Sequence, residues 1–269
     1  MPTKIFIMKT FLHSRKILFS DKYGWGDHIC KALGRWRYTP FFKSFDTVDL
    51  NEFDILVPQH LTDIAYLIDH HPELNGKKCF IPPMLALETC NDKLLFNQFM
   101  IASGFGDMIP NITAIPSFPY ILKKRIDEFG SRSRIIHHSK EEKIFQKFID
   151  SDDYYRQEYI TGKDEFTTHI LMVGGKITFH RTLQFTFEKD LFVKGVGCKA
   201  PSGKVVPFSQ IDTFESILNH LRFEGLCCFN FKLVHGQVKV FEVNPRYGGS
   251  LTRFLPKVMK EYTKLLSSC

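Results

Sequence analysis

The sequence predicts a mixed α/β and α+β fold, in which a small N-terminal lobe, residues 1–88, precedes a larger region, residues 89–269. The first lobe alternates short apolar runs with helix-like segments, as an α/β unit does. The larger region has more strand-like runs than a simple parallel sheet needs, and glycine turns join several of them, which indicates antiparallel pairing. We expect this region to divide into two subdomains, about 89–160 and 161–269.

The apolar runs of the first lobe are short and several of them stop at prolines. Such runs are typical of buried strands, while apolar residues three and four apart indicate helices. The strands predicted on this basis are 4–12, as an edge or first strand, 53–57 and 77–81, and the predicted helices are 27–36 and 60–71.

The larger region begins with a helix signal. Asn91 and Asp92 are good N-cap residues for a helix that closes on Gly104. Residues 127–136 combine glycine, small hydroxyls and cations, so we expect a mobile loop there. Strands are predicted at 120–124, 154–160, 166–173, 176–185, 227–234 and 238–243, and helices at 140–150, 212–223 and 251–266.

The composition is that of a folded protein that suits an anionic ligand. Among 269 residues, 43% are hydrophobic, and 36 basic against 29 acidic residues give a net charge of +7. We expect no nucleic-acid partner, because the basic residues lie largely within the motifs described below and no interleaved aromatic platform accompanies them.

The sequence also bears on location and cysteine chemistry. Basic residues interrupt the apolar runs of the first twenty positions, and no later run approaches membrane-spanning length. We therefore expect a cytoplasmic protein without a membrane partner. The seven cysteines form no CxxC pair and no regular zinc-ligand spacing, which predicts reduced thiols.

The strongest chemical signal is the segment FEVNPRYGGS at 241–250. Glu242 and Asn244 lie two apart, so in a strand both project from one face, and both offer oxygen ligands that suit Mg²⁺. Arg246 and the glycines at 248–249 follow the strand, where a cation and close backbone approach can meet phosphate oxygens.

A third oxygen donor is expected on the preceding strand. If the hairpin loop is 235–237, Val234 pairs with Val238 and Asn230 falls opposite Glu242. The alternative is a hairpin that turns its polar side chains to solvent.

This segment resembles the metal-binding segment of the ATP-grasp superfamily, above all its carbamoyl phosphate synthetase and biotin carboxylase branch. The resemblance implies that Glu242 and Asn244 ligate Mg²⁺, with Asn230 in the position of the third ligand. It also implies that Arg246 touches phosphate or the reacting carboxylate. The expected fold is therefore an ATP-grasp fold, two α+β subdomains that clasp ATP, preceded by a small α/β lobe.

Phosphate-binding motifs of the superfamily have counterparts upstream. Asn91-Asp92-Lys93 resembles the Asp-Lys pair that opens its first helix, which implies that Lys93 reaches a phosphate. The strand YILK and the loop Gly130-Ser131-Arg132-Ser133 resemble its strand lysine and phosphate loop, which places Lys123, Ser131 and Ser133 near phosphates. Here Lys124 replaces the common proline, and the loop has one glycine where many relatives have several. A basic surface loop is the alternative.

The segment QEYITGKDEF at 157–166 resembles the linker that holds adenine, which without this context would be an ordinary strand. The resemblance places Ile160 on the purine ring and an acidic side chain, Glu165 or Asp164, on the ribose. It also places Arg181 near the γ-phosphate. The linker residues expected to contact the nucleotide are Gln157, Glu158, Tyr159 and Ile160.

Four motifs in the right order over 91–250 imply a reaction as well as a fold. ATP and Mg²⁺, which Mn²⁺ can replace, would activate a carboxylate as an acylphosphate that an amine then opens, so the chain is expected to be a carboxylate–amine ligase. Because about 19 residues follow Ser250, we expect a stand-alone ligase for an amino acid, peptide or sugar acid, and a homodimer is compatible with the sequence. The alternatives are a small-molecule kinase and a non-catalytic nucleotide-binding protein.

Overall fold

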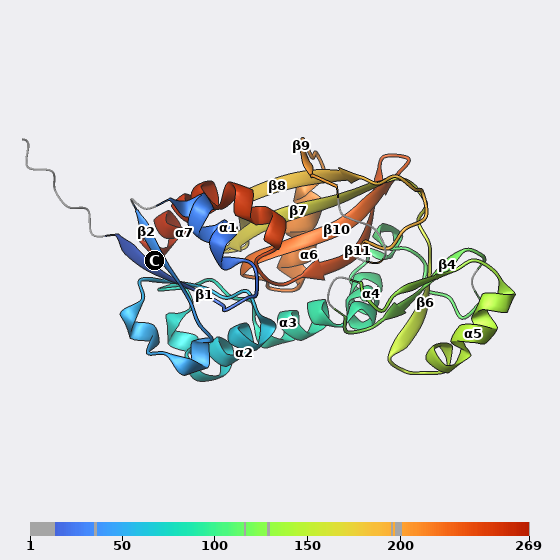
Figure 1. Ribbon diagram of the computed structural model, residues 1–269, viewed down its shortest axis with the longest axis horizontal. Helices are drawn as coiled ribbons and strands as arrows, with labels where there is room; N and C mark the ends of the chain where they lie inside the picture. Colours follow the sequence, from blue (N-terminus) through green and yellow to red (C-terminus); the bar gives the residue numbers. More distant parts are fainter. Residues whose placement is uncertain are drawn as a thin grey trace, which may run out of the picture.

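Three sheets follow one another along the long axis of the molecule (Figure 1). The computed structural model describes residues 14–34, 37–115, 117–127, 130–194, 196 and 201–268. The N-terminal lobe lies at one end, a five-stranded sheet in the middle and a small three-stranded sheet at the other end. The strand predicted at 4–12 lies outside the described residues.

The N-terminal lobe is built on a parallel sheet in the order β2-β1-β3. Alternate residues of the central strand face two cores: Ile17 and Phe19 pack towards the C-terminal helix, and Leu18 packs towards α2. The strands are β1 (Arg15–Phe19), β2 (Tyr38–Phe42) and β3 (Ile55–Val57), and the helices are α1 (Gly26–Leu33) and α2 (Leu61–His70). Both predicted helices and the 53–57 strand are confirmed; β1 and β2 were not predicted.

The strand predicted at 77–81 is wrong. Its apolar residues are buried, but among the described residues its backbone bonding to β3 is limited to the hydrogen bond from Leu56 N to the Lys78 carbonyl, at 2.8 Å. Phe80 N instead donates to the Tyr262 hydroxyl at 2.7 Å, and Ile81 N donates to the Asn75 side chain at 3.2 Å. Side chains thus satisfy amides that a strand would pair with a neighbour.

Two helices connect the N-terminal lobe with the rest of the chain: α3 (Met84–Asn91) and α4 (Lys93–Ala102). Asp92 caps α4 as predicted, accepting from the backbone N–H groups of Leu94 and Leu95 at 2.9 and 3.2 Å. Residue 88, the expected boundary between lobes, falls inside α3, and the division into domains stays a prediction.

The small sheet has the antiparallel order β5-β4-β6 and is covered by one helix, α5 (Ser139–Ile149). Its strands are β4 (Tyr120–Lys124), β5 (Arg134–Ile136) and β6 (Tyr154–Glu158). The segment expected to be a loop as far as residue 136 therefore ends in a strand at Arg134.

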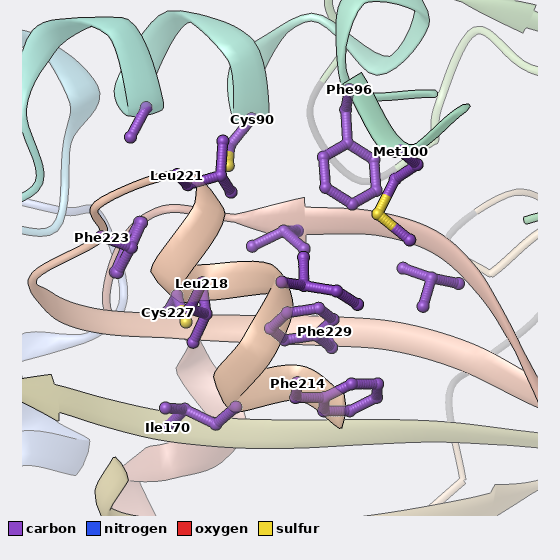
Figure 2. Packing of buried hydrophobic residues seen from close by; sticks show 14 of the residues in the cluster. Cys90, Phe96, Met100, Ile170, Phe214, Leu218, Leu221, Phe223, Cys227 and Phe229 are labelled. Atoms are coloured by element: carbon purple, nitrogen blue, oxygen red, sulfur yellow. The ribbon is translucent and has the colours of Figure 1, made fainter. Parts of the chain in front are cut away.

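The middle sheet has the order β11-β10-β7-β8-β9. Its strands are β7 (Asp164–Val173), β8 (Lys176–Thr186), β9 (Lys204–Val206), β10 (Gly225–Val234) and β11 (Gln237–Asn244). One face packs on α6 (Ile211–His220): Figure 2 shows Phe214 of α6 against Phe229 of β10, with ring centroids 4.1 Å apart. On β7 and β10 the side chains at alternate positions face away from this core.

The chain ends in α7 (Leu255–Leu266), which packs with α1 and β1. The helix predicted over 251–266 begins as a 3-10 turn, η5 (Gly249–Phe254), because Pro256 has no N–H and is tolerated only in the first turn of an α-helix. Shorter 3-10 turns occur at Phe45–Thr47, Leu50–Glu52, Pro72–Leu74 and Gly106–Met108.

The β10–β11 hairpin contains a bulge that the sequence did not reveal. Its turn is two residues, His235 and Gly236, both with positive φ, so Val234 pairs with Gln237 and the predicted Val234–Val238 pair is wrong. Phe231 then pairs with Val240, but Asn230 pairs with Glu242. Phe241 is the extra residue, and it restores the predicted Asn230–Glu242 pair.

A glycine at the start of β10 allows the N-terminal lobe to approach this sheet. Gly225 has φ +94°, and a Cβ there would lie 2.2 Å from the backbone oxygen of Phe80. We predict that Gly225→Ala lowers the free energy of unfolding by about 3 kcal/mol or more, since backbone cannot yield as a side-chain tip does. Gly104→Ala is the control: its φ is +83° but its Cβ meets nothing within 4 Å, so about 1–2 kcal/mol is expected. Equal losses in urea denaturation would refute the close-contact explanation.

Candidate functional site

A cavity of about 350 Å³ lies between the middle sheet and the small sheet. One wall is the face of β7, β10 and β11 that is turned away from α6. The remaining lining includes β4, the end of β6 with the two residues that follow it, and the segments 192–194 and 248–250. The residues predicted from the sequence that line it are Lys93, Lys123, Ser133, Gln157, Glu158, Tyr159, Ile160, Glu165, Asn230, Glu242, Asn244 and Arg246. The sequence motifs therefore converge on one site.

Two predicted residues do not line the cavity. The Ser131 hydroxyl donates to Asp127 at 3.0 Å, on the exposed side of its loop. Arg181 pairs with His169 across β7 and β8, but its guanidinium lies over the Phe179 ring, 5.0 Å from the centroid, and donates to the His180 carbonyl at 2.7 Å. Roles for these two residues have no geometric support here.

Cross-strand register sets the order of polar side chains across the sheet. Asn230 lies opposite both Thr167 of β7 and Glu242 of β11. Cys228, two residues earlier, lies opposite both His169 and Asn244. Because side chains two apart in a strand share a face, these two rows form one polar patch on the cavity wall.

Glu242 is the centre of this patch. Its Oε1 accepts from the Asn230 amide at 2.8 Å and from the Asn244 amide at 3.0 Å, and Lys93 Nζ lies 3.4 Å from Oε2. Burial acts to raise the pKa of Glu242, but the charges of Lys93 and Lys123 and the two amide bonds lower it to about 2. The side chain is an ionised carboxylate at neutral pH, not an exposed polar group of a solvated hairpin.

The donor set fits Mg²⁺. Magnesium is commonly held by one or two carboxylates together with substrate phosphates, and Glu242 supplies one carboxylate. Rotating the amides of Asn230 and Asn244 about their terminal bonds would present oxygen instead of nitrogen, and the Thr167 hydroxyl, which donates to Asn230 at 2.7 Å, can equally accept. Within the described ranges, no three or more His, Cys, Asp or Glu side chains form a metal-binding group.

Two lysines face the carboxylate from outside the middle sheet, Lys93 at the start of α4 and Lys123 on β4. Lys123 Nζ donates to the carbonyl of the bulge residue Phe241 at 3.1 Å and to Gln157 Oε1 at 3.3 Å. Burial lowers the pKa of Lys123 to about 8, partly offset by Glu242. Lys93 is also buried and donates to the Asp127 carbonyl at 2.7 Å. Both cations are held where an anion would meet them.

An ion pair holds these lysines relative to each other. Asp92, the N-cap next to Lys93, accepts from Arg125 Nε at 2.9 Å and from its Nη2 at 2.6 Å. Arg125 follows the β4 lysines, and its carbonyl accepts from Lys93 N at 3.0 Å. The start of α4 is thereby fixed to the end of β4.

The segment predicted to be the adenine linker, 157–160, lines the cavity at the end of β6. The Gln157 amide is used internally, donating to Asn97 Oδ1 and to the Pro110 carbonyl, each at 2.9 Å. Glu158 accepts from Asn111 N at 3.1 Å, and the Tyr159 hydroxyl donates to the Phe192 carbonyl at 2.8 Å. The side chains fix the linker in place, so a ligand there would meet apolar surface, including Ile160, and backbone.

The structure separates the two acids proposed for the ribose. Glu165 lines the cavity, with its carboxylate 3.0 Å from Lys194 Nζ. Asp164 is absent from the cavity lining among the described residues and accepts from the Thr186 hydroxyl at 2.5 Å. Glu165 is therefore the better placed of the two.

Several cavity residues were missed in the sequence. Lys232 is buried, donates to the carbonyls of Ile160 and Gly162 at 2.9 and 2.6 Å, and has its pKa lowered to about 8 by burial. Most of them could have been predicted from the alternation of side chains along β7 and β10. Glu165 and Asn230 identify which face of each strand is polar, and residues two apart from them lie on that same face. The missed polar residues are Thr167, His169, Lys194, Cys228, Lys232 and Ser250.

The Asp92–Arg125 pair gives a testable stability effect. Asp92→Asn keeps a good N-cap but removes the charge beside Arg125, so we predict a loss of roughly 1–3 kcal/mol in the free energy of unfolding at pH 7. Arg125 and the backbone bonds to the cap hold the pKa of Asp92 below its usual 3.8 despite partial burial. The difference from wild type should therefore persist above pH 4 and shrink as the pH falls further.

The control for this prediction is Asp153→Asn. Asp153 lies 3.8 Å from Lys124 and its side chain is 71% exposed, so about 0.5 kcal/mol or less is expected. Thermal or urea unfolding across pH 3–7 measures both variants, and an equal loss in the two would contradict a special role for the buried pair.

The fold is that of known ATP-grasp enzymes, although no family model and no curated protein sequence matches the chain. D-alanine–D-alanine ligase from Bacillus anthracis, solved with ATP, superposes with a TM-score of 0.63 at 14% identity, over 95% of this chain and 98% of that one. An L-amino acid ligase from Bacillus licheniformis gives 0.62 at 13%, over 93% and 74%. N5-carboxyaminoimidazole synthetase from Staphylococcus aureus, with ADP, gives 0.61 at 14%, over 88% and 71%. The chain has the ATP-grasp fold predicted from its sequence.

Proposed function

We propose that this protein is an ATP- and Mg²⁺-dependent ligase that activates a carboxylate as an acylphosphate and couples it to an amine, releasing ADP and phosphate. One observation carries the proposal: the ionised carboxylate of Glu242 lies between two amides and two lysines, across a cavity from the linker that begins at Gln157. The similar structures named above include ligases and a synthetase solved with ATP or ADP, which supports this choice.

We propose a position in the cavity for each part of the nucleotide. The purine would lie on Ile160 and the backbone near Tyr159, with the ribose hydroxyls at Glu165, which is buried. Lys93 and Lys123 would bind phosphate oxygens, and the loop at 130–133, of which Ser133 is buried, would cover them. A bound ribose would compete with Lys194 for Glu165.

The cationic side chains explain how two anions can react. Lys93, Lys123 and Arg246 are each less than a tenth exposed, so their charges act in a medium that screens weakly. They would offset the repulsion between a carboxylate and the γ-phosphate and the charge that grows on the departing ADP. Glu242, Asn230 and Asn244 would hold Mg²⁺, which supplies further charge neutralisation at the phosphates when bound.

The substrates are proposed from the fold. The chain would act on a small carboxylate such as an amino acid, a peptide or a sugar acid, together with an amine. A cytoplasmic location and a homodimer are part of the same proposal. Within the described part of the chain, no helix has the length and apolar character needed to cross a membrane, and the described cysteines are free.

Release of ADP from Mg·ATP tests the proposal. Purified protein is incubated with pools of carboxylates and amines, and we predict release that needs both pools and is abolished by EDTA. Glu242→Gln removes the one carboxylate of the metal site and should lower the rate at least 100-fold, roughly 3 kcal/mol. Glu215→Gln, which loses the ion pair between α6 and Lys176 of β8 and does not line the cavity, is the matched control and should keep the wild-type rate.

Other results would favour the other functions. A stable phosphorylated product formed without any amine would identify a kinase. Tight binding of Mg·ATP with no release stimulated by either pool would identify a nucleotide-binding protein. Full activity of Glu242→Gln would refute the assignment of the site.

A further inference from the structure

We propose that His169 and Ser250 form a hydrogen-bonded pair that binds the carboxylate of the acyl substrate, at the end of the cavity opposite the adenine linker. The two side chains come from β7 and η5, and His169 Nε2 lies 2.7 Å from Ser250 Oγ. Both line the cavity. The inference rests on the proposed function, because that function sets the direction in which the nucleotide lies.

The register of β7 places His169 beyond the phosphates. Glu165, Thr167 and His169 are two residues apart from one another and share one face of the strand. Thr167 lies opposite Asn230, which in turn lies opposite Glu242. At about 3.4 Å per residue, His169 lies roughly 14 Å along the strand from Glu165. With the ribose at Glu165 and the metal at Glu242, the next position along the strand is where an acceptor of the γ-phosphate must lie.

The imidazole ring is fixed in place by its surroundings. His169 is 1% exposed, and a Cβ built on Gly248 would lie 2.7 Å from its Cε1 and 3.2 Å from its Nδ1. The ring is packed against the Gly248 backbone, so Nδ1 is closed to a ligand and Nε2 is directed at Ser250. Gly248, at φ −101°, is required here for its lack of a side chain and not for its backbone conformation.

This packing determines how the Ser250 hydroxyl is oriented. Nδ1 is buried and has no hydrogen-bond partner. Orphaned buried N–H donors are rarer than under-satisfied acceptors, so the ring proton belongs on Nε2. Nε2–H then donates to Ser250 Oγ, and the hydroxyl hydrogen of Ser250 is free to donate into the cavity.

The ring acts as a neutral hydrogen-bonding group. Burial, assisted by the charge of Lys194, lowers the pKa of His169 to about 3, so the ring is unprotonated at neutral pH. The neighbouring Cys228 is a thiol there, since burial raises its pKa to about 11. Arg246 also lines the cavity, and its positive charge acts on Cys228, the cross-strand neighbour of His169. An O–H donor beside a guanidinium suits a carboxylate, and His169 orients the donor as a positioning residue.

The test uses acetate as the simplest carboxylate. Sodium acetate is titrated into ¹⁵N-labelled protein saturated with MgADP, with sodium chloride of equal ionic strength as the control. Long-range ¹H–¹⁵N spectra report the imidazole nitrogens, and the signals missing in His169→Gln identify those of His169. We expect the neutral Nε2–H form at pH 7 and a saturable shift of the Nε2 signal with acetate.

Two variants test the hydroxyl. Ser250→Ala should weaken acetate binding at least about tenfold, as the loss of a hydrogen bond to a charged group implies, and Ser250→Thr, which keeps the hydroxyl, should retain binding within about threefold. Titration calorimetry of MgADP with each variant shows that the protein is folded.

The outcomes separate this inference from the proposed function. Absence of MgADP binding to the wild type would defeat the proposed function. Normal MgADP binding with no saturable acetate shift, with a proton on Nδ1, or with Ser250→Ala binding acetate as the wild type does, would overturn the His169–Ser250 pair alone.

Discussion

The bulge at Phe241 is the constraint on which the arrangement of the site depends. Before it, Val238 and Val240 face the core on α6; a regular strand would send Glu242 to the same face. The extra residue reverses the alternation, so that Glu242 and Asn244 face the cavity while Val243 returns to the core. It also aims the Phe241 carbonyl at Lys123. One inserted residue thus connects the polar patch on the cavity wall with Lys123 of β4.

The buried charges of the site destabilise the fold and make the site suited to an anion. Lys123 and Lys232 have their pKa values lowered to about 8 by burial, and Lys93 and Arg246 are also buried. Buried cations without full compensation destabilise a fold, and proteins accept this at functional sites. Glu242 offsets part of the charge. A nucleotide with its metal would supply the rest, and its binding would stabilise the protein.

The sequence predicted most of the strands and helices of the larger region, because glycine turns and caps such as Asp92 are local signals. The prediction failed where contacts between residues far apart in the sequence determine the local structure. Residues 77–81 look like a strand, but Tyr262 and Asn75 satisfy their amides. The Asn230–Glu242 pair was predicted correctly from a wrong turn: the loop is one residue shorter than expected, and the bulge, which has no local signature, compensates.

The candidate site shows the same division. Motif residues such as Lys93, Lys123 and Glu242 could be found because their order along the chain is specific. His169 belongs to no motif, and Ser250 is the last residue of the FEVNPRYGGS segment but was given no role there. The two are 81 residues apart, so their contact depends on β7 and η5 lying side by side in the fold. Arg181 was expected near the γ-phosphate, but its guanidinium lies over the Phe179 ring instead.

The proposed function depends above all on the cavity face of β7, β10 and β11 binding the metal of a nucleotide at Glu242. A crystal structure with ADP and Mn²⁺ tests this most directly, because anomalous scattering locates the manganese ion itself. We predict an anomalous peak in contact with Glu242, with the purine beside Ile160. A peak elsewhere, or ADP outside this cavity, would contradict it.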